Sequence, residues 1–141
     1  MKHKQFIFTA MMMLAAITIS PSQGFFPVLR SYSQGQKERL DKVYAIALAS
    51  KNKQIVESAL AIVTMMKLDL PNESFPLVST KIEELKSSVE SPSIRYKAFL
   101  AGAVFSDPAK FQSLSKRPVE SMDDFFASLD GTGTTTILSS K

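Results

Sequence analysis

The sequence predicts an all-α protein built from antiparallel helical hairpins, arranged as an α-α superhelix and preceded by a signal peptide. Apolar residues recur every three or four positions through much of the chain, which is the spacing of helices with one buried face. Serine, asparagine or proline stands where most of these patterns begin, as is usual at helix N-termini. The amino-terminal segment has a basic start, an apolar run and small residues in succession, which indicates an export signal.

The composition indicates one folded domain without disulfide bonds. The chain has 141 residues, of which 45% are hydrophobic and 21% are charged, as in ordinary globular proteins. It has no cysteine, so apolar burial must hold the fold together. Removal of the two lysines in the predicted signal peptide lowers the formal charge from +4 to +2. This charge is too small for a concentrated nucleic-acid-binding face, and we expect no nucleic-acid partner.

Residues 1–24 have the layout of a signal peptide. The apolar run at residues 6–19 is shorter than the roughly 20 residues that a spanning helix needs, so an uncleaved anchor is the weaker alternative. Ser22 and Gly24 place small side chains next to a cleavage bond. We predict cleavage after Gly24, export to the periplasm or the medium, and no integral membrane span after cleavage.

The mature chain begins with a short apolar arm, residues 25–32, which contains two phenylalanines and a proline. The arm can pack over its own domain or act as an interaction peptide. We favour packing, because apolar chain ends usually lie against their own domain.

A helical domain is expected over residues 33–130, and its first hairpin covers residues 33–70. The side chains of Ser33 and Gln36 fit a reciprocal capping box at the start of the first helix. Asn52 is the expected N-cap of the second helix. That second helix is apolar over so much of its circumference that we expect it to lie centrally.

The second hairpin is expected to cover residues 74–106. Ser74 is the predicted cap of its first helix, with Pro76 in the first turn. Ser91 is the predicted cap of its second helix. Gly102, together with the alanines around it, would let a neighbouring helix approach closely.

Short C-terminal helices are expected over residues 107–130, interrupted by Pro118. Ser121 can cap the last of them, and Gly131 is expected to end it in the left-handed conformation. Residues 131–141 are rich in threonine and serine without a helical period, and we predict a flexible tail.

An internal repeat relates the two hairpins. A shift of 39 positions pairs the capping residues Asn52 and Ser91, and it pairs Ala59 with Ala98. The segment after Ser91 resembles the inner helix of HEAT-like repeats. In that helix a capping residue precedes an aliphatic residue, an arginine often follows, and small residues come next. The resemblance covers residues 33–106. It implies a binding scaffold, although two hairpins are fewer than the three that such arrays usually need.

The same resemblance implies where a partner would bind. Arg95, Tyr96 and Lys97 follow the cap of the second inner helix, at the end that borders the binding surface in HEAT-like arrays. They are the predicted partner-binding residues. The alternative is that Arg95 forms an ion pair within its repeat and Tyr96 packs against the neighbouring hairpin.

Catalytic chemistry has little support in the sequence. The single histidine, His3, lies in the predicted signal peptide, so the mature chain would lack His and Cys nucleophiles and metal ligands. Asp130-Gly-Thr-Gly-Thr resembles the phosphorylation sequence of P-type ATPases. In that family the aspartate follows a buried strand, whereas here it ends a predicted helix. We predict no enzymatic activity, no cofactor and no metal site.

The predicted function is therefore that of an exported, non-catalytic helical scaffold that binds another protein. The alternative is a structural or assembly subunit of a cell-envelope complex, which would expose a contiguous apolar patch. A carboxylate-dependent hydrolase is a minor alternative, and it would need a closed pocket with converging acids.

Overall fold

The computed structural model describes residues 24–88 and 90–139, and this part of the chain contains helices and no strands. The predicted all-α class is therefore confirmed. The predicted signal peptide lies outside the described residues, except for Gly24.

Two short 3-10 helices and five α-helices follow one another along the described residues. Their bounds are η2 (Pro27–Ser31), α2 (Gln34–Leu48), α3 (Lys53–Asp69), α4 (Pro76–Leu85), α5 (Pro92–Ser106), η3 (Pro108–Lys116) and α6 (Met122–Ser139).

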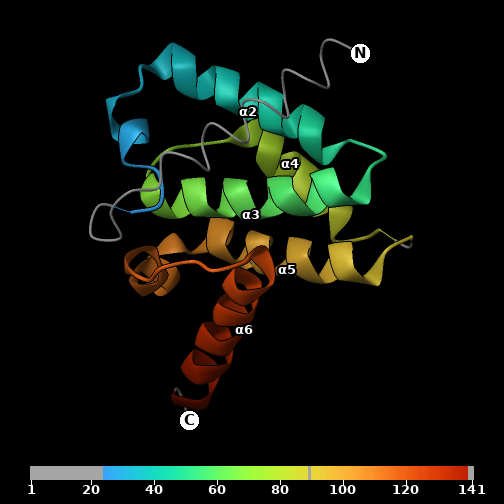
Figure 1. Ribbon diagram of the computed structural model, residues 1–141, viewed down its shortest axis with the longest axis vertical. Coiled ribbons are helices and arrows are strands. Elements are labelled where there is room, and N and C mark those ends of the chain that lie inside the picture. Colours follow the sequence, from blue (N-terminus) through green and yellow to red (C-terminus); the bar gives the residue numbers. More distant parts are fainter. Residues whose placement is uncertain (1–23, 89, 140–141) are drawn as a thin grey trace.

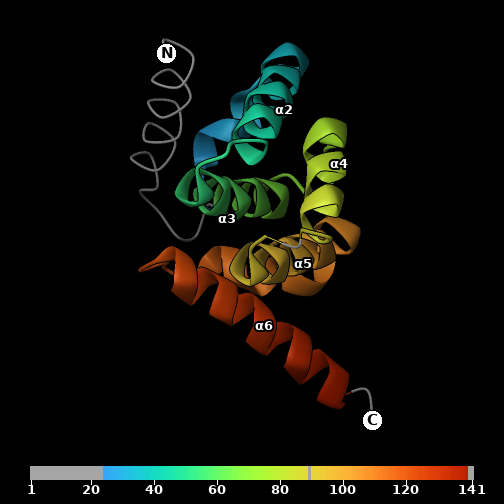
Figure 2. The ribbon, with the colours of Figure 1, turned by 90° about the vertical axis from the view of Figure 1, so that its right-hand side faces the viewer.

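Helices α3 and α5 lie side by side at the centre of the molecule and run in the same direction (Figure 1). Helix α2 covers α3 on the side away from α5, and α6 crosses the far side of α5 (Figures 1 and 2). Helix α4 stands across this stack, where it contacts both α2 and α5 (Figure 2).

Helix α3 is central, as its apolar circumference predicts. Ten of its 17 residues are buried, and it contacts α2, α5, α6, η2 and η3. The buried residues include Val56, Leu60, Val63 and Leu68, which lie on more than one face of the helix. A helix that is apolar on several faces must be covered on several sides, and the other elements provide that cover.

Most of the predicted helix caps are present. Ser33 and Gln36 form the reciprocal capping box of α2. The side chain of Asn52 caps α3 by accepting two backbone N–H groups. Ser91 and Ser121 each accept a backbone N–H from the residue three positions further along. These local bonds fix where the helices begin.

The N-terminus of α4 is capped from another helix. Its N-cap residue is Phe75, which makes no side-chain cap bond, so the predicted cap at Ser74 is wrong. Instead, the buried carboxylate of Asp41 in α2 accepts the N–H groups of Leu77 at 3.1 Å and Val78 at 2.9 Å. A carboxylate is favoured there by the free N–H groups and by the positive end of the helix dipole.

We expect Asp41→Ala to lower the free energy of unfolding by about 2 kcal/mol, because two helix N–H groups lose their acceptor in a buried place. Denaturant unfolding followed by circular dichroism measures the change. Glu38→Ala, at an exposed acid of the same helix, is the matched control and should change stability by less than about 0.5 kcal/mol. Equal effects of the two substitutions would contradict the capping role.

Small residues of α5 allow close helix contacts. Ala98 and Ala101 are fully buried in the core. A Cβ atom on Gly102 would lie 3.3 Å from Cδ of Lys86 and 3.7 Å from Cγ2 of Ile82. The end of α4 therefore approaches α5 at this glycine, as predicted from the small side chains.

Ala98→Leu should overpack the core around α5 and lower the free energy of unfolding by roughly 1 to 3 kcal/mol. Thermal and denaturant unfolding measure the loss. Ala127→Leu makes the same change at an exposed position of α6 and should cost less than about 0.5 kcal/mol. If Ala98→Leu leaves stability unchanged, Ala98 does not lie in a tight helix contact.

The last helix is longer than the sequence predicts. Helix α6 continues through Gly131 to Ser139, so the expected helix end at Gly131 is wrong. The backbone of the predicted tail is helical as far as Ser139. Among the described residues Gly24 alone has a positive φ, so Gly131 is not left-handed. Glycine within a helix costs only about 1 kcal/mol relative to alanine, which is not enough to force an end. The C-terminal part of α6 extends past the helix stack (Figure 2).

The apolar arm is part of the core. Phe25, Phe26 and Leu29 are all buried, and the Phe25 ring meets the Phe125 ring edge to face at a centroid distance of 5.7 Å. Both phenylalanines of the arm thus pack on the domain. Across the residues that the structure describes, no helix has the length and apolar character needed to cross a membrane.

Candidate protein-binding surface

Helix α5 presents two large aromatic side chains to solvent. Tyr96 is 45% exposed and Phe99 is 61% exposed. They are three residues apart in one helix, so they lie on the same face. We call them the Tyr96–Phe99 surface. The other faces of α5 are buried through Ile94, Ala98, Leu100, Ala101 and Val104.

The middle of α6 borders this surface at Asp130. Slight burial is the main cause that raises the pKa of the Tyr96 phenol, and the neighbouring carboxylate of Asp130 raises it further. Tyr96 therefore remains a neutral hydrogen-bond donor at physiological pH. The surface combines an apolar ring, an amphipathic ring and an adjacent acid.

Lys97 is directed into the molecule. It is 8% exposed, and its ammonium contacts the carboxylates of Glu57 at 2.9 Å and Asp123 at 3.2 Å. It also lies 5.6 Å from the centroid of the Phe126 ring. Burial lowers the pKa of Lys97, but the bonds and charges of the two carboxylates outweigh burial and raise it. These internal contacts argue against the predicted role of Lys97 in binding a partner.

Arg95 is also engaged internally. Its Nη1 donates to the backbone carbonyl of Ser88 at 2.8 Å, and the side chain is half-buried. Of the three predicted contact residues, only Tyr96 is exposed. Phe99 was not among the predicted contact residues, because a large apolar side chain in a helix is expected to be buried. Its spacing of three from Tyr96 is the signal that could have found it.

Replacement of Lys97 should test its internal role. Lys97→Met keeps the apolar stem but removes the charge that joins α3, α5 and α6, so we expect a loss of roughly 1 to 2 kcal/mol in the free energy of unfolding. Denaturant unfolding provides the measurement. Lys81→Met removes a more exposed pair with Glu84 and should cost less than about 0.5 kcal/mol. If the two substitutions lower the free energy of unfolding by the same small amount, Lys97 behaves as a surface charge.

Two buried carboxylates serve backbone donors and do not converge with other acids. Asp41 caps α4, as described above. Asp69, 8% exposed at the end of α3, accepts the N–H of Phe25 at 2.9 Å and the N–H of Phe26 at 2.6 Å. Within the described residues, no three His, Cys, Asp or Glu side chains form a group that could hold a metal ion.

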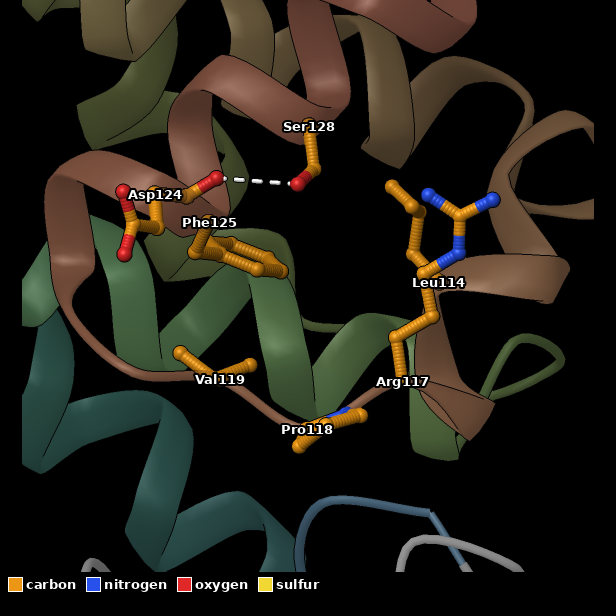
Figure 3. Close-up of a pocket in the computed structure, with 7 residues that line it drawn as sticks. All are labelled: Leu114, Arg117, Pro118, Val119, Asp124, Phe125 and Ser128. Carbon is orange, nitrogen blue, oxygen red and sulfur yellow. Dashed lines mark hydrogen bonds between the residues drawn. The ribbon is translucent and has the colours of Figure 1, made fainter.

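A shallow hollow lies where the loop before α6 meets that helix (Figure 3). Its volume is about 30 Å³, room for a few water molecules. Asp124 is the acid among the lining residues, and its backbone carbonyl accepts the Ser128 hydroxyl at 2.9 Å (Figure 3). The complete lining is Leu114, Arg117, Pro118, Val119, Asp124, Phe125 and Ser128.

Comparison with known proteins gives no family assignment. No protein-family model, curated protein or solved structure gives a significant match to the chain.

Proposed function

We propose that the chain is an exported, non-catalytic helical scaffold that binds another protein through the Tyr96–Phe99 surface. The observation that carries this proposal is the exposure of Phe99, at 61%, on a helix whose other large apolar residues are mostly buried. Aromatic side chains are enriched in the centres of protein interfaces, where burial of one ring gives a large share of the affinity.

The predicted likeness to HEAT-like repeats is part of the proposal. Helices α3 and α5 start at Lys53 and Pro92, which are 39 positions apart, and each follows a side-chain cap. Their side-by-side, parallel arrangement supports a repeat (Figure 1). The burial of Leu60 and the exposure of Phe99 at equivalent positions weaken the match. In a repeat array this difference would leave the second inner helix free to face a partner.

Export is proposed from residues 1–24, which have the charge and apolar pattern of a signal peptide. The absence of cysteine is compatible with an oxidising compartment, because no thiol requires protection. The alternative, a subunit of a cell-envelope complex, would also be exported, and it differs from the scaffold in how it folds. Such a subunit would fold fully only with its partner.

The proposal predicts that Phe99→Ala weakens partner binding about 30-fold, the effect of losing an interface residue worth roughly 2 kcal/mol. Ile46→Ala is the matched control, because Ile46 is 60% exposed and belongs to α2. Helix α2 lies on the other side of α3 from α5 (Figure 1). A tagged chain is cross-linked in its native cell, the partner is identified by mass spectrometry, and affinities are measured with purified proteins.

A partner whose affinity falls with Phe99→Ala and not with Ile46→Ala would support the scaffold and its surface. Equal affinities for all three forms would contradict the proposed surface. A purified chain that lacks cooperative unfolding until the partner is added would favour the alternative of an assembly subunit.

A further inference from the structure

Among the buried charges of the described residues, Asp69 has neither an ion-pair partner nor the N-terminus of an α-helix beside it. Lys97 is paired with two carboxylates, and Asp41 faces the N-terminus of an α-helix. No cation of the described residues lies within ion-pairing distance of Asp69. A buried carboxylate without a countercharge is unfavourable, and two neutral amide donors compensate only in part.

The donors to Asp69 are the first two residues after the predicted cleavage bond. Oδ1 accepts the N–H of Phe25 at 2.9 Å, and Oδ2 accepts the N–H of Phe26 at 2.6 Å. The carboxylate therefore lies where a chain that begins at Phe25 would place its α-amino nitrogen. The rings of both residues are buried, so packing holds that nitrogen in position.

Gly24 lies unusually close to the same carboxylate. Its φ is +95°, and a Cβ atom at this position would be 2.5 Å from Oδ1 of Asp69. A chain that continues before Phe25 therefore needs a glycine here, both for the backbone conformation and for space. Hydrolysis of the Gly24–Phe25 bond would remove this requirement, because the folded chain would then begin at Phe25.

We propose that Gly24–Phe25 is a processing site and that the new α-ammonium of Phe25 forms a buried ion pair with Asp69. This inference rests on the proposed export of the chain, since it requires an endopeptidase that accepts small residues before the cut. Hydrolysis consumes one water and yields the Gly24 carboxylate and the Phe25 ammonium. Cleavage precedes folding, because Phe25 is buried in the folded domain.

The charge of the new N-terminus completes the site. Burial raises the pKa of Asp69, while the bonds from Phe25 and Phe26 and the charge of Arg30 lower it in part. An ammonium at Phe25 supplies a full positive charge in contact with Oδ1 and favours the ionised carboxylate. In return, the carboxylate raises the pKa of the α-amino group above its usual value of about 7.7 to 8.0.

The first experiment determines the N-terminus of the full-length protein expressed in an exporting cell, by intact mass and N-terminal sequencing. A start at Phe25 supports processing. Retention of Met1 or a start elsewhere overturns the inference, because no ammonium then forms at Phe25. This step tests export separately from the ion pair.

The second experiment compares the exported chain that begins at Phe25 with a chain that begins at Ser20, in which the Gly24–Phe25 bond is intact. We expect an α-amino pKa raised by at least one unit in the Phe25 form, measured from the pH dependence of its acylation rate by mass spectrometry. An ordinary pKa overturns the ion pair even if processing at Gly24 occurs.

Stability should depend on pH in the same comparison. An ammonium with a raised pKa stabilises the folded chain below its unfolded pKa, and this stabilisation is lost as the pH rises through the raised value. The Phe25 form should therefore melt higher than the Ser20 form at pH 7, and the difference should disappear near about pH 10.

Asp69→Asn in both forms completes the test. The difference between the two forms at pH 7 should vanish in this variant, because the amide carries no charge. If the difference persists without the carboxylate, the ion pair is refuted. If the variant does not fold, the α-amino pKa of the Phe25 form still decides the question.

Discussion

The apolar circumference of α3 is the constraint on which the rest of the structure depends. Ten of its 17 residues are buried, so no single neighbour can cover it. Helices α2 and α5 cover opposite sides, and the arm and η3 cover parts that these two leave. Because the chain has no disulfide bonds, this shared burial must supply most of the stability. The arrangement of the other helices follows from the need to surround α3.

Apolar burial does not by itself fix how the surrounding segments are oriented, and three buried charges add that specificity. Asp41 sets the position of the start of α4, and Asp69 sets the position of the arm. Lys97 joins α5 to α3 and α6. A buried charge is tolerated only with correctly placed partners, so each contact penalises alternative packings. Together the three contacts link the arm, α2, α3, α4, α5 and α6.

Most helix caps and the buried faces of the helices could be predicted from the sequence, whereas contacts between particular distant side chains could not. The caps at Ser33, Asn52 and Ser91 are local, and all three are present. The cap of α4 by Asp41 comes from another helix. In the sequence Asp41 stands among charged residues, which favours an exposed position. Gly131 permits a helix end without requiring one. For the candidate surface, sequence reasoning found Tyr96 and missed Phe99, because apolarity predicts burial unless the neighbours are known.

The external cap of α4 has a consequence for how the protein folds. Helix α4 has only ten residues, fewer than an isolated helix needs for stability in water, and it lacks a side-chain cap of its own. Its cap lies 36 positions earlier in the chain. The helix therefore becomes stable only after α2 has formed and docked, and loss of α2 exposes its first N–H groups. Residues 34–85 should thus open and close as one cooperative unit, and amide hydrogens of α4 should exchange no more slowly than those of α2.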